Sequence, residues 1–95
     1  MRENDNPVIL PIEDNIDLHT FTPRDIPDVV ESYLEAAHEE GLEEVRIIHG
    51  RGKGVQKERV RQVLEKSDLV AHFEEATPER GGWGATVVTL KRGAH

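Results

Sequence analysis

The segment from His49 to Gly54 reads HGRGKG and alternates three glycines with two cations. It follows an apolar run typical of a strand and precedes a run with helical periodicity. Glycine lets backbone N–H groups approach an anion closely, and the N-terminus of a following helix adds partial positive charge. The segment therefore predicts a strand–loop–helix unit whose loop binds phosphate. The predicted phosphate-binding residues are Gly50, Arg51, Gly52, Lys53 and Gly54.

A chain of 95 residues has room for one domain with a modest core. One third of the residues are charged, but Ile, Val and Leu recur in ordered patches, so we expect a folded α/β unit. No apolar run approaches membrane-spanning length, and the start does not resemble a secretory signal. The chain has no cysteine, which excludes disulfides and thiolate chemistry. We expect a cytoplasmic protein without a membrane partner.

The net charge of −7 hides a strong segregation of charge along the chain. Residues 1–45 hold 13 acids and two bases, whereas residues 46–66 hold seven bases and two acids. A local basic patch can bind a row of phosphates even when the rest of the surface is acidic. An ordinary solvated helix face is the alternative for this basic stretch. The seven bases are Arg46, Arg51, Lys53, Lys57, Arg59, Arg61 and Lys66.

The first half of the ordered chain predicts a strand and an amphipathic helix. Residues 1–15 contain two prolines and scattered acids, which indicates a flexible or partner-ordered arm. Residues 16–19 alternate apolar and polar side chains, as in a short strand. A helix then begins after either Thr22 or Asp25, because each precedes a first turn that contains proline. Apolar residues at spacings of three and four continue to Ala37, and Gly41 is placed to end the helix.

The second half predicts a strand at 44–49, a helix with apolar residues at 60, 63 and 64, and strands at 69–76 and 85–90. Residues 77–84 are a loop by composition. The predicted order is β-α-β-α-β-β. The domain should cover residues 16–92, and residues 93–95 form a tail.

The topology predicts where the two histidines that follow strands will lie. Right-handed crossovers make at least the first two strands parallel, so His19 and His49 should lie near each other at the carboxyl edge of the sheet. Open α/β sheets usually bind ligands at this edge. Asp17, two residues before His19, should lie on the same face of its strand.

These three side chains are candidate catalytic residues for phosphodiester cleavage, which needs proton transfer and neutralisation of phosphate charge. Imidazoles titrate near neutral pH, so His19 and His49 form a natural proton-transfer pair. Asp17 is suited either to orient His19 or to bind a divalent cation such as Mg²⁺ or Mn²⁺. One aspartate with two histidines is too sparse a set to name a metal. The structural alternative gives each histidine a hydrogen-bonding role, at a strand end or in closing the glycine loop.

Trp83 is the only tryptophan and lies among glycines rather than on a periodic apolar face. Its ring is suited to stack on an unpaired base, with Gly82 and Gly84 flanking it. Packing over a sheet edge is the alternative and the more common role of a single tryptophan.

Three motifs in order resemble those of the Smr (small MutS-related) domain family. Residues 16–19 are similar to its LDLHG signature, residues 49–54 to its HGxGxG loop, and residues 82–87 to its GxGATx ending. The resemblance covers about residues 16–91 and implies an α/β two-layer sandwich. In that fold a four-stranded mixed sheet carries two helices on one face, as in the C-terminal domain of translation initiation factor three.

The resemblance implies a stand-alone nucleic-acid-binding domain, because family members bind nucleic acid and several nick DNA or cleave RNA. Thr20 stands where the family usually has glycine, so we expect a different loop shape after His19. The leading hypothesis is an endonuclease with little sequence specificity. One alternative is a non-catalytic adaptor that holds RNA, DNA or the ribosome by its phosphates. Another is a module that binds small anions or nucleotides.

Overall fold

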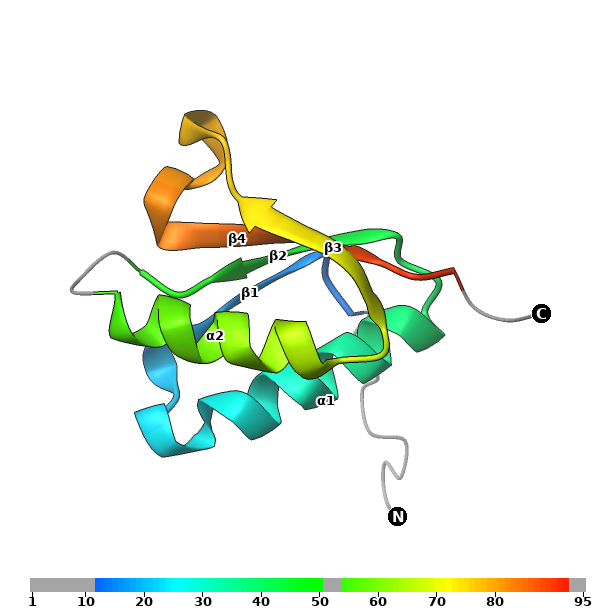
Figure 1. Ribbon diagram of the computed structural model, residues 1–95, viewed down its shortest axis with the longest axis horizontal. Helices are drawn as coiled ribbons and strands as arrows, with labels where there is room; N and C mark the ends of the chain where they lie inside the picture. Colours follow the sequence, from blue (N-terminus) through cyan, green and yellow to red (C-terminus); the bar gives the residue numbers. More distant parts are fainter. Residues whose placement is uncertain (1–11, 51–53, 93–95) are drawn as a thin grey trace, which may run out of the picture.

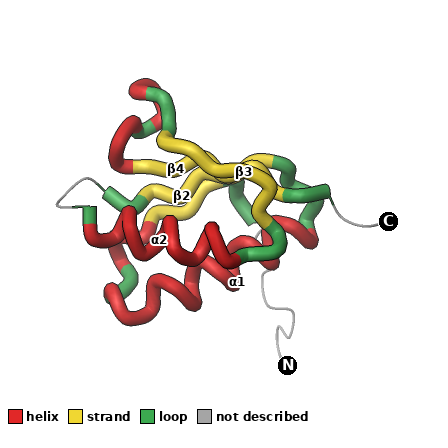
Figure 2. Tube along the Cα trace, viewed as in Figure 1, coloured by secondary structure: helices red, strands yellow, loops and turns green. Residues whose placement is uncertain are grey.

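Two helices cover one face of a four-stranded sheet (Figure 1). The computed structural model describes residues 12–50 and 54–92. The strands are β1 (Asn15–Asp17), β2 (Glu44–Ile48), β3 (Val70–Glu75) and β4 (Ala85–Leu90), and the helices are α1 (Ile26–Glu39) and α2 (Val55–Lys66). Figure 2 shows the helical layer on one side of the sheet. The predicted element order and two-layer α/β class are confirmed.

The sheet is mixed because the last strand is inserted between two earlier ones. The strand order is β1-β2-β4-β3, with β1 parallel to β2 and β4 antiparallel to both neighbours. Asp17 pairs with Ile48 at the carboxyl ends of β1 and β2, where Ala85 begins β4. The carboxyl ends of the first two strands therefore share one edge, as the crossover rule predicts.

Both predicted starting points are used at the beginning of α1: Thr22 precedes a 3₁₀ turn, and Asp25 precedes the α-helix itself. Residues Pro23–Asp25 form a 3₁₀ turn that continues into α1, and the Thr22 hydroxyl donates a hydrogen bond to Asp25 Oδ2 at 2.9 Å. The helix ends where Gly41 adopts φ +82°, which costs glycine little. Leu42 N then donates to the carbonyl of Ala37, so the chain turns directly towards β2.

The core lies between the helices and the sheet. Twelve buried residues form it, including Leu18, Val30, Leu34, Ile47 and Val88. Burying each aliphatic side chain contributes about 1.5 to 3 kcal/mol, so this layer supplies most of the stabilisation.

A smaller apolar cluster occupies the opposite face of the sheet. It contains Ala76, Ala85 and Val87, with Ile48 packed against it. Residues 78–84 form two 3₁₀ turns, Pro78–Arg80 and Gly82–Gly84, which rise on the side of the sheet away from the helices (Figure 1). The loop predicted at 77–84 is therefore ordered.

The first strand differs from its predicted bounds. It ends at Asp17, and His19 lies in a 3₁₀ turn, Leu18–Thr20, rather than at the strand terminus. Leu18 is buried in the core on the same face as Ile16, so the alternation continues past the strand, but the pairing with β2 stops at Asp17. Before the strand, the carbonyl of Asp14 accepts a hydrogen bond from Arg46 N.

In the described part of the chain, no helix is long and apolar enough to cross a membrane.

Candidate functional site

Four segments meet at the carboxyl edge of the sheet: the ends of β1 and β2, the start of α2, and the turn at Gly82–Gly84 (Figure 1). The carbonyl of Gly84 accepts hydrogen bonds from both His49 N, at 3.0 Å, and Gly50 N, at 2.9 Å. The beginning of the glycine loop is thus fixed to the segment that leads into β4.

His19 and Asp17 form an exposed pair at this edge. Asp17 Oδ1 accepts hydrogen bonds from the backbone N–H of His19, at 3.0 Å, and from its ring Nδ1, at 2.8 Å. The imidazole is 75% exposed and the carboxylate 51% exposed. With Nδ1–H donating to the carboxylate, Nε2 is the ring nitrogen left for a ligand.

The same two bonds keep Asp17 ionised. The backbone N–H of His19, followed by its ring, lowers the pKa of the Asp17 carboxyl below its usual 3.8. An ionised carboxylate at Nδ1 orients the imidazole and fixes the tautomer in which Nδ1 carries the proton. The sequence predicted this pairing on one strand face, whereas the structure makes it through the 3₁₀ turn.

His49 has a different environment, since only 8% of it is exposed. Its Nδ1 lies 3.0 Å from the carbonyl of Gly50, which can only accept, so Nδ1–H is the donor. In the neutral ring Nε2 then accepts from the Thr86 hydroxyl at 2.9 Å. Burial lowers the pKa of His49 below 6.5, which maintains the neutral form. Both ring nitrogens are engaged, as the structural alternative predicts for this residue.

Asp17 and His49 leave the sheet on opposite faces. Asp17 pairs in register with Ile48, which belongs to the cluster away from the helices. His49 bonds to Thr86, whose partner Ile47 lies in the core under the helices. The two strand ends are neighbours, but the sheet separates the Asp17 carboxylate from the His49 ring.

Trp83 packs against the first turn of α2. Lys57 Nζ lies 4.5 Å from the centroid of the indole ring and 2.9 Å from Glu75 Oε1. A Cβ built on Gly54, which has φ +84°, would lie 3.3 Å from Trp83 Cη2. Glycine at the start of α2 therefore satisfies both the backbone conformation and the close approach of the indole. The ring remains 39% exposed, so it packs and also presents a surface.

The charges on α2 are partly neutralised within the described residues. Arg61 pairs with Glu58 and Glu65 on its own helix. Arg59 and Lys66 make no ion pair with any residue in the ranges 12–50 and 54–92. The predicted basic patch is therefore narrower than the sequence suggests. Three of the predicted phosphate-binding residues, Arg51, Gly52 and Lys53, lie outside the described residues.

The backbone conformation at position 20 does not require glycine. Thr20 lies in the 3₁₀ turn and is not among the described residues with positive φ, all of which are glycine.

A divalent cation would find Asp17 and His19 adjacent to each other. No group of three potential His, Cys, Asp or Glu ligands occurs in the part of the chain that is described, so these residues do not identify a metal.

Sequence reasoning missed Thr86 and Glu75 as members of the site, and it gave Lys57 only as one base of the predicted patch. Thr86 lies within the motif at 82–87, but nothing in its spacing indicated the bond to His49. The antiparallel pairing of β3 with β4 places Glu75 beside Thr86, and this depends on strand order. The polar position 86 in an otherwise buried strand was the one available signal.

The fold and this edge define a small α/β domain with a glycine loop and a His–Asp pair at the ends of parallel strands. A model of the Smr domain family matches residues 16–91, and the chain belongs to that family. Its structure is similar to the Smr domain of Thermus thermophilus MutS2, with a TM-score of 0.78 and 34% identity over 83% of this chain and 99% of that domain. YdaL, a stand-alone small MutS-related protein from Escherichia coli, has a TM-score of 0.78 and 28% identity over 83% of this chain and 65% of YdaL.

Among proteins of known sequence, a relative named endonuclease MutS2, from Aquifex aeolicus, is 36% identical over 86 residues. The match spans 87% of this chain but only 11% of that protein. Endonuclease MutS2 of Staphylococcus aureus is 38% identical over 80 residues, again 11% of its length. The chain is thus an Smr domain related to one part of these larger proteins.

Proposed function

We propose that this domain binds the phosphate backbone of DNA or RNA at the carboxyl edge of the sheet and cleaves phosphodiester bonds there. The observation that carries the proposal is the exposed His19, whose Nδ1–H is bound by an ionised Asp17. The family relationship to proteins named endonuclease MutS2 supports the reaction class. The fold offers no helix with an evident set of base-reading side chains, so we expect little sequence specificity.

His19 would carry the proton transfers. Its side chain is exposed, and Nε2 can take a proton from the attacking oxygen or give one to the leaving oxygen. Asp17 would stabilise the imidazolium that forms and hold the ring in one tautomer. His49 belongs to the proposed site as a positioning residue, because its nitrogens hold Gly50 and Thr86.

The glycine loop and the start of α2 would bind the phosphates. Among the described residues no side chain caps the N-terminus of α2, where backbone N–H groups are suited to bind an anion. Gly50 and Gly54 bound the loop, and Arg51 and Lys53 would supply its mobile cations. Trp83, held between Gly82 and Gly84, would stack on an unpaired base beside the loop.

A nicking assay tests the enzymatic claim. Supercoiled plasmid and structured RNA are incubated with the wild type, His19→Ala, Asp17→Asn and a matched control, His72→Ala. His72 is also an exposed histidine beside a carboxylate, 3.4 Å from Glu74, but it lies on β3. We expect cleavage to fall at least tenfold in the first two variants and to persist in the control, since proton transfer contributes about 10²-fold or more. Cleavage by wild type no higher than by His19→Ala would end the enzymatic claim.

A non-catalytic adaptor for RNA, DNA or the ribosome is the second candidate. The burial of His49 supports the adaptor function, because only one of the two candidate histidines, His19, is then exposed for proton transfer. This function predicts salt-dependent binding of an oligonucleotide that is weakened in Arg51→Ala and Lys53→Ala and unchanged in His19→Ala. Fluorescence anisotropy at two salt concentrations separates it from the enzymatic proposal. The same measurement with chelator and with added Mg²⁺ or Mn²⁺ tests metal dependence.

A further inference from the structure

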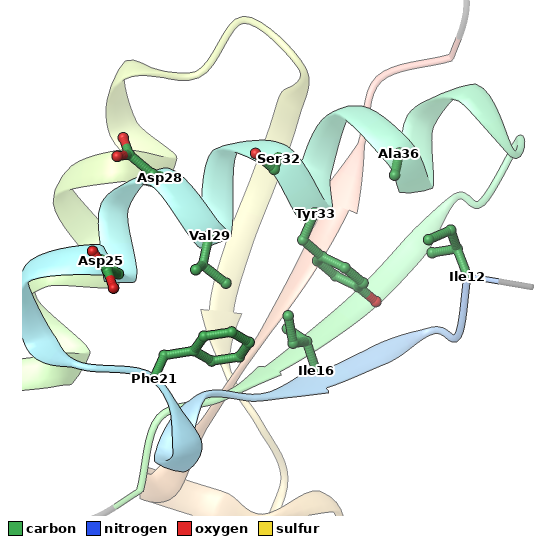
Figure 3. A pocket seen from close by; sticks show the side chains of 9 residues that line it. All are labelled: Ile12, Ile16, Phe21, Asp25, Asp28, Val29, Ser32, Tyr33 and Ala36. Atoms are coloured by element: carbon green, nitrogen blue, oxygen red, sulfur yellow. The ribbon is translucent and has the colours of Figure 1, made fainter. Parts of the chain in front are cut away.

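An apolar groove runs between α1 and the edge strand β1, away from the glycine loop (Figure 3). Its volume is about 580 Å³, within the range of sites that hold ligands or side chains of a partner. The side chains of Ile12, Ile16 and Phe21 line it from the strand side, and those of Val29 and Ala36 from the helix. Phe21 is 39% exposed, so a large apolar surface here is left in water.

Carboxylates frame this groove at both ends. Asp25 and Asp28 line it beside Phe21. At the other end the Tyr33 hydroxyl donates to the carbonyl of Glu13. Burial, followed by the charges of Asp14 and Glu13, raises the pKa of Tyr33 to about 12. These two carboxylates therefore lie close to the Tyr33 end of the groove, and the described residues that line it include no lysine or arginine.

The apolar lining and the nearby carboxylates together indicate which kind of molecule can bind in the groove. Nucleic acid would be repelled by the four carboxylates, because unscreened like charges destabilise a complex. A segment with aliphatic side chains alone would give the carboxylates no positively charged partner. A segment with aliphatic side chains flanked by lysine or arginine fits the groove. Its aliphatic side chains fill the apolar part, and its lysine or arginine side chains pair with the carboxylates.

The backbone beside the groove suits an extended segment. Within the described residues β1 pairs only with β2, and none of them pairs with the other edge of this three-residue strand. Peptides commonly bind by adding a strand to such an edge while their alternate side chains enter a neighbouring pocket. We propose that the groove between α1 and β1 docks an extended, basic and aliphatic segment of a partner protein. The inference is independent of the proposed function at the glycine loop.

The test uses the full chain and a fluorescein-labelled peptide in which lysine alternates with leucine and valine. Backbone amide shifts in NMR spectra locate the bound peptide, and anisotropy gives its affinity. We expect shifts at Ile16, Val29 and Ala36, and weaker binding by about fivefold in Asp28→Lys, the effect of reversing one exposed charge. Glu31→Lys is the matched control, because Glu31 lies on the same helix but faces the space beside α2. Phe21→Ser should weaken binding, whereas Val55→Ser, at another exposed apolar residue, should not.

Several results would overturn the proposal. A peptide with glutamate in place of lysine that binds equally well would remove the charge argument. Groove shifts that appear with oligonucleotide rather than peptide would assign the surface to nucleic acid. Concentration-dependent self-association lost in Phe21→Ser would assign it to a second copy. Nuclear Overhauser contacts between residues 8–10 and the groove in the free chain would assign it to the chain's own N-terminal segment.

Discussion

Replacing Thr86 by valine tests whether the buried histidine is held by one hydroxyl group. Valine has nearly the same shape as threonine but cannot donate to His49 Nε2, which accepts from Thr86 Oγ1 at 2.9 Å. Both residues are buried, with 6% and 8% of their surfaces exposed, so water cannot easily replace the lost donor. A buried acceptor left without a partner costs about 1 to 3 kcal/mol.

The added methyl group of valine offsets part of this cost, because it is apolar and lies in the core layer. We expect the free energy of unfolding to fall by about 1 to 2 kcal/mol. For a domain of this size the slope with urea is about 1 kcal/mol per molar, so the unfolding midpoint should fall by about 1 to 2 M. Urea unfolding followed by circular dichroism at pH 7.5 measures this shift. Thr86→Ser keeps the hydroxyl and serves as the control for lost packing.

A double-mutant cycle completes the argument. Replacing both partners by apolar groups leaves no orphaned acceptor on the ring, so Thr86→Val should cost less in a His49→Leu background than in wild type. We expect a coupling energy of about 1 kcal/mol. If Thr86→Val is as stable as wild type, or if the two substitutions are additive, the hydrogen bond does not hold the ring.

Three further outcomes follow from the same edge of the sheet. Gly81→Ala should lower the free energy of unfolding by about 2 to 4 kcal/mol in urea titrations, since Gly81 has φ +116° and a Cβ there would lie 2.9 Å from Ala85 Cβ. Glu75→Gln should tighten oligonucleotide binding by anisotropy about twofold to fivefold at low salt, because Lys57 loses its bound carboxylate, and the gain should vanish at high salt. Burial lowers the pKa of His49 in the folded state, so stability should fall as pH drops below 6.5, where the unfolded chain binds the proton first. Thermal unfolding from pH 7.5 to 5 should show this slope in wild type and a smaller one in His49→Gln.

Most of the fold could be predicted because its signals are local. The periodic apolar face of α1, the glycine at its end and the β-branched run of β4 each reflect an intrinsic preference that the tertiary structure preserves. The exact end of β1 could not be predicted, since the local alternation continues to Leu18 whereas the pairing with β2 stops at Asp17. The strand order was also beyond local reasoning, because β4 is placed by long-range pairing.

In the candidate site, too, contacts between residues close in sequence could be predicted and contacts between distant residues could not. The Asp17–His19 contact depends on two residues close in sequence, and a local rule brought them together. The surroundings of His49 depend on Thr86, which is 37 positions away, so the burial of its ring could not be predicted from the glycine motif. Charges on α2 were overcounted because the intrahelical pairs of Arg61 were not considered.

The exposure of Asp17 and His19 on the surface of the domain has an evolutionary consequence. Neither side chain belongs to the buried core, so under the proposed function a mutation at either position removes the proton-transfer pair and leaves the core packing intact. His49 offers no such freedom, since its replacement disturbs two strands at once. Within this family, members that only bind should therefore arise by changes in the exposed pair, while the histidine of the glycine loop persists in active and inactive descendants alike.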